Sequence, residues 1–418
     1  MTSPAAPQKA PATPFAFGRN AAFVLFVAAL VPGIIQLFHP TGFGFGQGFE
    51  MPSIARNLAE HGVYGNPFPP AETGPTAVVP PLYPLLLAAL IKVLRAPALI
   101  VFGAMLGNIL ANALTAAILP RVSETALGDD RPGIAAGLLW IGCIRLMPQW
   151  DFSCTMAAML LFCLFTARSL SRDPAAAWGA AAGILAGLLT LLNPATLIMS
   201  LPWTVFLLLS RRLRPARACW YAGALLVGLA VTNGVWVARN YRIWQAPVLR
   251  TNFGIAVYTS NNPCAQPSLI RHQHAGCDEA TNPSGNESEA RLMRTLGEVE
   301  YDRRRTADAM AWIRANPARF RQLTLSRIFE FWFPVPLEPV YPAYVIWAVT
   351  LLSIPGLIAL TERRNPFAWY LSFVWLVYPL MYYIVVSSDR YRYPLLWTSL
   401  LAAGYFVARI PLLHRLLR

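Results

Sequence analysis

Apolar runs of about twenty residues recur along most of the chain, separated by short polar segments and by two longer ones. A helix needs roughly 20 apolar residues to cross the hydrocarbon core of a bilayer. The pattern therefore predicts about ten membrane-spanning helices. They are expected at 20–38, 97–119, 132–148, 153–170, 176–192, 195–210, 217–237, 342–361, 366–386 and 393–411.

Clusters of basic residues decide how these spans are oriented. "SRRLRPAR" (210–217), "TERRNPF" (361–367) and the C-terminal "HRLLR" are expected on the cytoplasmic side. Working backwards from them, loops 39–79 and 238–341 face outside and both termini lie inside. This holds only if the shorter, proline-led segment 80–95 does not cross, so we expect it to be a re-entrant or interfacial helix.

The same reasoning divides the chain into four parts of an all-α polytopic membrane protein. They are a disordered cytoplasmic N-terminus (1–19), a transmembrane bundle (20–237), an external, partly helical loop domain (238–341), and C-terminal transmembrane helices with a short cytoplasmic tail (342–418).

Composition agrees with this picture and narrows the partners. Of the 418 residues, 56% are hydrophobic and 13% charged, which is too apolar for an ordinary soluble domain. The net charge of +14 comes from Arg and Lys scattered at the ends of apolar runs. That distribution is typical of membrane topology and not of a groove that follows phosphates, so we expect membrane lipids as partners and no nucleic acid.

The polar stretch "FEMPSIARNLAEHGVYGNPF" (49–68) predicts a short amphipathic helix at the external membrane surface. Pro52 suits the first helical turn and Gly62 suits the end. Ile54 and Leu58 lie on one apolar face. Glu50 comes just before the helix, whose dipole should keep the carboxylate ionised, as a catalytic base must be. The alternative is a cap-like carboxylate or a solvated surface charge.

Three further polar groups are expected at the outer membrane boundary. Asp151 begins a span and either caps that helix or contacts a substrate. In "SSDRYRYP" (387–394), Arg390 and Arg392 can offer forked donors to a phosphate. Pro394 favours extended backbone before it, in which side chains two apart converge, so we expect both arginines to reach one anion. The alternative for them is snorkelling toward lipid head groups.

The cysteines and histidines of the long loop have different significance. Cys264 and Cys277 are expected to form a disulfide if the loop faces an oxidising compartment. His272 and His274 are a weak metal signal, because no Cys/His cluster accompanies them. No cofactor is required by the chemistry described below, and no spacing indicates a metal, although a divalent ion is compatible with it.

The pattern "E-x-x-x-IARNLAEHGVYGNPF…GPTA…PPLYPLLLAAL" resembles the first external loop of GT-C membrane glycosyltransferases. More closely, it resembles bacterial members of glycosyltransferase family 39, which are related to protein O-mannosyltransferases and lipid A aminoarabinose transferases. Further matches at 236–263, 297–320 and 390–394 extend the resemblance over nearly the whole chain. One departure is clear: the commoner pattern has an acidic pair where this chain has Gln47 and Gly48, and Glu50 follows about one helical turn later.

The resemblance implies a GT-C-like transmembrane helix bundle with two large external loops in a bacterial plasma (inner) membrane. It implies a hexosyl- or pentosyltransferase that moves a sugar from a polyprenyl-phosphate donor to a lipid, glycan or protein acceptor on the external (periplasmic) side. A first-loop carboxylate then acts on the acceptor, with Glu50 and Asp151 as catalytic candidates. The candidate substrate-binding residues are Arg56, His61, Tyr83, Arg239, Asn240, Arg250, Asn252, Asn261, Asn262, Arg390, Tyr391 and Arg392.

Two other functions compete with the transferase. One is a lipid or glycan transporter or flippase, and the other is a non-catalytic membrane subunit derived from the GT-C fold. Transporters usually place charged residues within their spans, whereas the spans predicted here are nearly free of acidic residues. We therefore favour the transferase.

Overall fold

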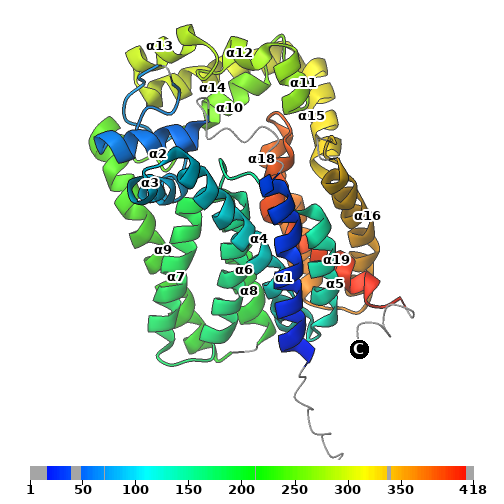
Figure 1. Ribbon diagram of the computed structural model, residues 1–418. Helices are drawn as coiled ribbons and strands as arrows, with labels where there is room; N and C mark the ends of the chain where they lie inside the picture. The colour runs from blue at the N-terminus through cyan, green and yellow to red at the C-terminus, as the bar shows by residue number, and fades with distance from the viewer. Residues whose placement is uncertain (1–16, 39–48, 70, 212, 337–339, 411–418) are drawn as a thin grey trace, which may run out of the picture.

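The computed structural model describes residues 17–38, 49–69, 71–211, 213–336 and 340–410. Within these ranges the secondary structure is helical, with two isolated β-bridges and no strand. The helices form a bundle of long apolar helices with a cap of shorter helices at one end (Figure 1). The expectation of an all-α polytopic membrane protein is confirmed.

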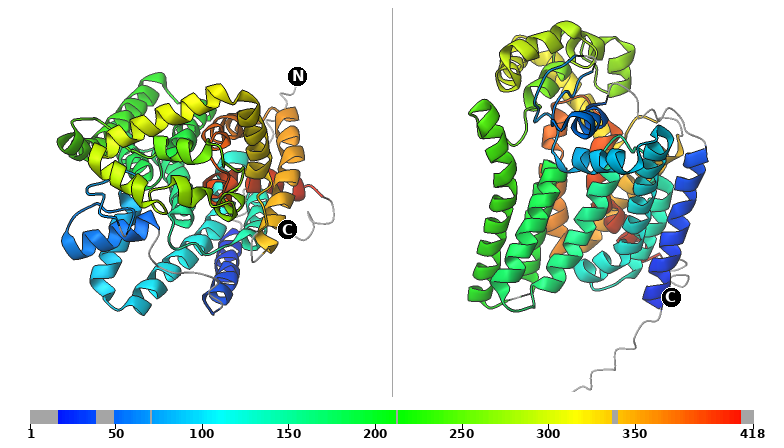
Figure 2. Two further views of the ribbon diagram at one scale, coloured as in Figure 1. Left: turned by 90° about the horizontal axis from the view of Figure 1, so that it is seen from above. Right: turned by 60° about the vertical axis from the view of Figure 1, so that its left-hand side comes forward.

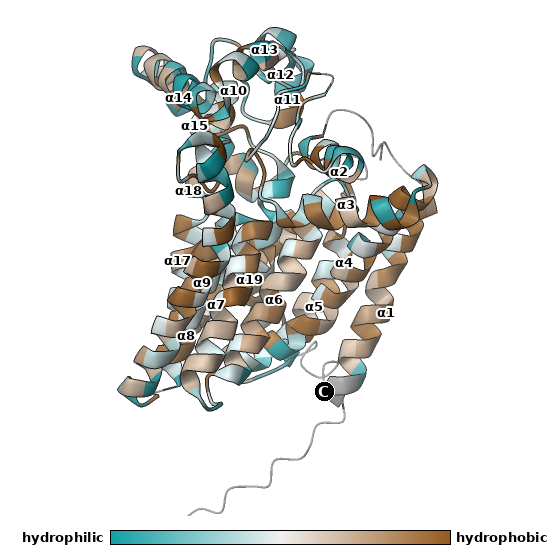
Figure 3. Ribbon diagram, turned by 90° about the vertical axis from the view of Figure 1, so that its left-hand side faces the viewer, coloured by the Kyte–Doolittle hydropathy of each residue, from teal (hydrophilic) through white to brown (hydrophobic). Residues whose placement is uncertain are grey.

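The bundle contains the apolar helices. They are α1 (Phe17–Phe38), α4 (Pro97–Leu127), α5 (Arg131–Cys143), α6 (Phe152–Ser169), α7 (Ala175–Leu192), α8 (Leu197–Ser210), α9 (Pro215–Trp244), α16 (Tyr341–Glu362), α17 (Phe367–Val377), α18 (Leu380–Tyr383) and α19 (Tyr393–Val407). Among the described residues, six of these helices, α1, α4, α6, α7, α9 and α16, are long and apolar enough to cross a membrane. Figure 3 shows the apolar colouring concentrated in this part of the molecule.

The cap lies over one end of the bundle and is more polar (Figure 3). Its helices are α2 (Glu50–His61), α3 (Leu82–Leu94), α10 (Phe253–Ser260), α11 (Leu269–His274), α12 (Cys277–Thr281), α13 (Glu287–Leu296), α14 (Glu298–Ala315) and α15 (Pro317–Trp332). Helix α3, predicted to be re-entrant or interfacial, lies across the end of the bundle beside α2 (Figure 2). The two loops predicted to be external, 39–79 and 238–341, therefore meet at the same end in their described parts.

Several predicted boundaries differ from the structure. Helix α1 begins at Phe17, inside the segment expected to be disordered. Helix α9 continues seven residues into the expected loop and ends where Gln245 adopts the left-handed conformation. The predicted span 366–386 is divided into α17 and α18, because Pro379 has no N–H with which to continue the first helix.

Helices α7 and α9 pack at close range through small residues. A Cβ atom added at Gly179 or Gly183 would collide with the backbone carbonyls of Tyr221 and Leu225 on α9. Stripes of small residues let helix backbones approach in this way in membranes, where packing and not the hydrophobic effect joins the helices. The glycine stripe therefore fixes α9 against α7. Helix α9 is the element that precedes the cap helices α10 to α15.

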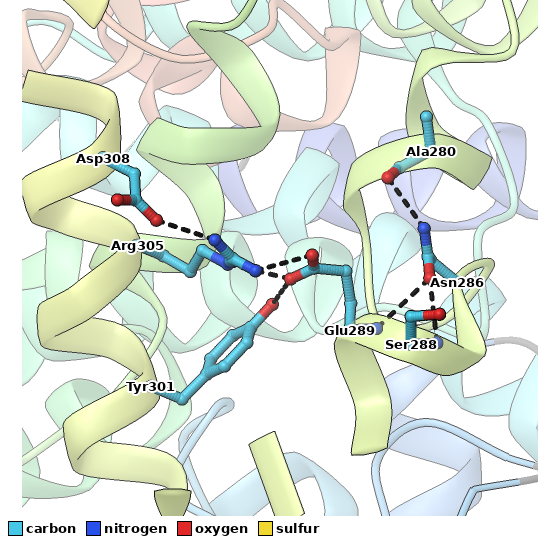
Figure 4. Close-up of polar contacts among 7 residues, drawn as sticks. All are labelled: Ala280, Asn286, Ser288, Glu289, Tyr301, Arg305 and Asp308. Atoms are coloured by element: carbon cyan, nitrogen blue, oxygen red, sulfur yellow. Dashed lines mark hydrogen bonds and ion pairs between the residues drawn. The ribbon is translucent and has the colours of Figure 1, made fainter. Parts of the chain in front are cut away.

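Polar bonds connect the helices of the cap. Arg305 of α14 donates to both carboxylate oxygens of Glu289 on α13, at 2.8 and 2.6 Å, and to Asp308 at 2.7 Å. Tyr301 donates to the same glutamate at 2.6 Å (Figure 4). The Arg305 guanidinium also lies 4.5 Å from the ring centroid of Tyr258 on α10. Helix α14 thus connects α13 to α10, and α10 reaches down to the bundle.

A disulfide joins Cys264, just after α10, to Cys277 at the start of α12, with a Cα–Cα distance of 5.7 Å. This is the pairing expected from the sequence. It closes a short loop that lies above the bundle in the cap.

Candidate functional site

A cavity of about 410 Å³ lies where the cap meets the bundle. Helix α2, the start of α6, the α7–α8 turn, helix α10 and the segment around 378–394 all contribute to its wall. Four charged side chains line it: Glu50, Asp151, Arg250 and Arg390. Glu50 and Asp151, the two catalytic candidates from the sequence, thus line one cavity.

Glu50 is the first residue of α2. The helix begins there and ends at Gly62, which has a φ of 72°, and Ile54 and Ala55 are fully buried beneath it. The predicted helix and its apolar face are thus confirmed. Burial raises the pKa of Glu50, against the opposing effect of Arg390 and Arg250. The helix dipole does not keep this carboxyl in its usual range, since removal from water outweighs it.

Asp151 comes directly before α6 and is 2% exposed. Its Oδ2 accepts hydrogen bonds from Thr155 Oγ1 at 2.7 Å and from Asn193 Nδ2 at 3.0 Å. Its side chain makes no capping bond to an α6 amide. Burial raises the pKa of Asp151, and the bonds from Thr155 and Asn193 oppose that rise. The capping alternative therefore does not describe how this carboxylate is used.

Arg390 lies in a short 3-10 turn, Asp389–Tyr391, and faces the cavity. Its Cζ lies 4.1 Å from the centroid of the Trp150 ring, and its Nη2 donates to Tyr391 Oη at 3.1 Å. The turn is fixed from the other side, because Arg145 donates to Asp389 at 2.8 Å. The guanidinium is thus held over an aromatic face that forms part of the cavity wall.

Arg392 does not converge with Arg390, and this prediction was wrong. Its backbone has helical angles, φ −79° and ψ −29°, because the turn continues directly into α19. In a helix, side chains two apart diverge by about 200°. Arg392 is 0% exposed, donates to Ser399 at 2.8 Å and lies 4.1 Å from the centroid of Trp332. Pro394 is accommodated in the first turn of α19 and does not enforce extended backbone.

Arg250 and Asn252 line the cavity, as does Tyr391. Arg250 Nε donates to the carbonyl of Val78 at 2.7 Å, which fixes the orientation of the guanidinium. These three predicted substrate-binding residues are therefore brought together with Arg390.

The other predicted substrate-binding residues lie outside the lining of the cavity. Arg239 donates to the carbonyls of Thr76 and Tyr64, and Tyr83 donates to that of Pro148. Buried amides bond to backbone in the same way, as shown by Asn240, Asn261 and Asn262. In this structure these five side chains therefore donate hydrogen bonds to the protein backbone.

Two candidates on α2, Arg56 and His61, are exposed on the side of the helix away from its buried face. Gln47 and Gly48, which replace the commoner acidic pair, lie outside the described residues.

Aromatic side chains and one amide were missed by the sequence reasoning. Trp150, Tyr378 and Tyr382 line the cavity, and Asn193 both lines it and bonds to Asp151. Asn193 lies in "LLNPATL", where the 3-10 helix Pro194–Thr196 forms the connection between α7 and α8. The turn lies at the same end of the bundle as the cavity and lines it.

A second hollow, an apolar groove of about 610 Å³, follows α6 and α7 down the bundle. Leu161, Phe165, Leu185 and Leu188 are among the apolar side chains that line it. Leu192, at the end of α7, lines both the groove and the charged cavity. The two hollows are therefore adjacent. In the part of the chain that the structure describes, no group of three or more His, Cys, Asp and Glu residues is arranged to hold a metal ion.

No family model matches the sequence, and no curated protein matches it. Similarity appears in the fold. The archaeal oligosaccharyltransferase AglB from Archaeoglobus fulgidus, in complex with an inhibitory peptide and a dolichol-phosphate, aligns with a TM-score of 0.52 at 10% identity over 94% of this chain and 50% of that one. The apo form of the Archaeoglobus fulgidus oligosaccharyltransferase gives 0.56 at 11% identity, covering 96% and 52%. Its complex with Zn and sulfate gives 0.52 at 12% identity, covering 93% and 48%.

The fold is similar to that of these archaeal oligosaccharyltransferases. The chain spans about half the length of the solved structures it matches. The predicted all-α membrane bundle is confirmed, whereas the assignment to the GT-C superfamily, to family 39 and to a bacterial type stays a prediction. At this level of identity the similarity establishes the fold, and activity has to be argued from the site.

Proposed function

We propose that this chain is an integral-membrane glycosyltransferase that moves a sugar from a polyprenyl-phosphate donor to an acceptor at the external membrane face. The observation that carries the proposal is the single cavity lined by two carboxylates and two arginines at the boundary between bundle and cap. Transfer of a sugar from a phosphate requires a group that accepts the acceptor's proton and cations that stabilise the leaving phosphate.

The chemistry assigns the four charged residues to two tasks. The acceptor's oxygen or nitrogen forms a bond to the anomeric carbon while the bond from that carbon to the phosphate oxygen breaks. The acceptor's proton passes to Glu50 or Asp151, whose raised pKa values bring them toward the range in which a carboxyl exchanges protons near neutrality. Arg250 and Arg390 hold the phosphate as its charge grows.

The apolar groove supports a lipid-linked donor. It runs along α6 and α7 and shares the lining residue Leu192 with the cavity, which favours a polyprenyl chain in the groove with its phosphate at the arginines. One structural neighbour is recorded with a dolichol-phosphate. Basic clusters at the opposite ends of the spans support an external site with both termini cytoplasmic. The membrane proposed is a bacterial plasma membrane. Hexoses and pentoses are the sugars proposed, with a lipid, glycan or protein acceptor.

The test uses purified full-length protein in lipid nanodiscs with a panel of polyprenyl-phosphate hexoses and pentoses. We expect sugar release or transfer, with Glu50→Gln or Asp151→Asn reducing the rate by roughly 10²-fold or more. Glu60→Gln is the matched control, since Glu60 lies on the exposed side of the same helix.

Transport is measured on the same protein in liposomes. Movement of the lipid-linked sugars between leaflets without any transfer or release would refute the transferase and support a flippase. Absence of both activities with every donor would support a non-catalytic subunit.

A further inference from the structure

Glu298, the first residue of α14, is 4% exposed and takes no part in the chemistry described above. Its Oε2 accepts a hydrogen bond from Thr76 Oγ1 at 2.6 Å, and its Oε1 accepts one from the Ala77 amide at 2.6 Å. The hydroxyl of Thr251 also donates to Oε1. One carboxyl of the cap thus joins two segments that are distant in sequence, the first external loop and the chain just before α10.

These two segments are also bonded to each other and form one wall of the cavity. The Thr251 amide donates to the Ala77 carbonyl at 3.1 Å, and Arg250 Nε donates to the Val78 carbonyl at 2.7 Å. The residues that follow in each segment, Val78 and Asn252 among them, line the cavity together with Arg250. The position of the Arg250 guanidinium therefore depends on a wall that Glu298 holds from behind.

We propose that Glu298 is a positioning residue that fixes the cavity wall around Arg250, and that its protonation state sets how firmly the wall is held. The proposal rests on the proposed function only in assigning the wall the task of holding Arg250 for the donor phosphate. The holding itself is a property of the fold and can be measured without any substrate.

The surroundings of Glu298 determine the direction of the pH effect. The charged and titratable groups that act on it from other elements are Arg239 of α9, which donates to the Thr76 carbonyl at 2.7 Å, and Tyr64 of the first loop. Arg250 is the sequence neighbour of Thr251, which bonds to Glu298. Burial raises the pKa of Glu298 from 4.5 to about 7, although the bonds from Thr251, Thr76 and Ala77 and the charge of Arg239 oppose the rise.

The sign follows from linkage. A carboxyl that leaves the wall for water regains its ordinary pKa of 4.5, while the held carboxyl keeps the raised one. Protonation therefore favours the held state. The wall is held most firmly below about pH 4.5 and is progressively loosened as the pH rises to about 7, above which the effect is complete.

Two substitutions distinguish the effect of the hydrogen bonds of Glu298 from the effect of its protonation. In Glu298→Gln, the amide oxygen replaces Oε1 and accepts from Ala77 and Thr251, while the amide nitrogen donates to Thr76, so the wall is held but no longer titrates. In Glu298→Ala, all three bonds are lost. Glu300→Ala is the matched control, because Glu300 lies two residues along the same helix with an exposed side chain that pairs with Arg303.

The experiment is hydrogen–deuterium exchange of the full-length protein in nanodiscs from pH 5 to pH 8, corrected for the intrinsic exchange rate. We expect opening of the amides at 76–79 and 249–252 to increase by up to roughly 10²-fold over this range in the wild type and in Glu300→Ala. Glu298→Gln should show no such pH dependence, and Glu298→Ala should exchange at least about tenfold faster at pH 5.

Donor kinetics provide the second measurement. Glu298→Ala should raise the KM for a polyprenyl-phosphate sugar about tenfold while Glu298→Gln stays close to the wild type, because only the former releases Arg250. Exchange in Glu298→Ala that matches the wild type would overturn the proposal, as would a pH dependence retained in Glu298→Gln. If exchange behaves as expected but the wild type transfers no sugar, the proposed function fails and the holding role of Glu298 stands.

Discussion

The same substitution should reduce activity at Arg390 and leave it unchanged at Arg392, although only one residue separates the two arginines. Arg390 faces the charged cavity, whereas Arg392 is fully buried against Trp332 and α19. Replacement of each by Met keeps an unbranched apolar side chain of similar length and removes only the guanidinium. The pair Arg390→Met and Arg392→Met therefore compares loss of a cavity charge with loss of a buried one.

For Arg390, the expected loss is one charge-assisted contact to the donor phosphate, worth about 1.5–3 kcal/mol. This corresponds to a decrease of roughly 10- to 150-fold in kcat/KM at limiting donor. Stability should change little, because the methionine can still pack on the Trp150 ring and the hydrogen bond that is lost, to Tyr391, is local.

For Arg392, donor use should be close to that of the wild type. Its Nη2 bonds to Ser399, but its Nε and Nη1 have no hydrogen-bond partner among the described residues. A buried charge that is only partly paired contributes little net stability, and an apolar residue of similar volume is often neutral or stabilising in its place. The unfolding temperature of Arg392→Met in detergent should therefore equal or exceed that of the wild type.

The assays are initial rates over a donor titration and thermal unfolding of the same preparations. Wild-type kcat/KM in Arg390→Met would refute a phosphate contact at this position and leave Arg250 as the cation of the cavity. A tenfold decrease of kcat/KM in Arg392→Met with an unchanged unfolding temperature would show that Arg392 contributes to the use of the donor.

Three further outcomes follow from the contacts. Asn193→Ala removes a hydrogen-bond donor to Asp151, so we expect roughly fivefold lower kcat/KM. Because the pKa of Asp151 then rises further, activity should begin to increase at a higher pH than in the wild type. An unchanged pH–rate profile would contradict this. Replacement of Cys264 and Cys277 by Ser should cost about 3 kcal/mol of cap stability, measured by unfolding with and without reductant, with no further effect of reductant on the variant. Gly183→Val forces α7 away from α9 and should lower the unfolding temperature strongly, whereas the same change at Gly223, where added atoms meet open space, should not.

Much of the fold was predictable because lipid imposes simple requirements on a chain. A span must be apolar and helical over its whole length, and α1, α4, α6, α7, α9 and α16 satisfy this by local composition alone. Helix α2 was predictable for the same reason: Pro52, Gly62 and the spacing of Ile54 and Leu58 are local signals. The disulfide pairing followed from the presence of only two cysteines in one long loop.

Part of the site was also predictable from local sequence. Asp151 and Arg390 lie next to predicted spans, and Glu50 and Arg250 lie in the two loops predicted to be external. A membrane brings such residues into a single layer. The sequence therefore determined which polar residues lie in this layer, but not which of them line the same cavity.

The tertiary structure alone decided between Arg390 and Arg392 and between Arg250 and Arg239. In each case two guanidinium groups of equal chemistry occupy nearby positions in the sequence. Backbone angles turn Arg392 into the bundle, and free carbonyls of the first loop bind Arg239. The same holds for Glu298, whose carboxyl lies behind the cavity wall because Thr76, Ala77 and Thr251 come together there only after the cap has folded. Local sequence specifies the helices and the membrane face on which a side chain lies. Residues distant in the chain decide whether that side chain makes its hydrogen bonds to the protein or can make them to a ligand.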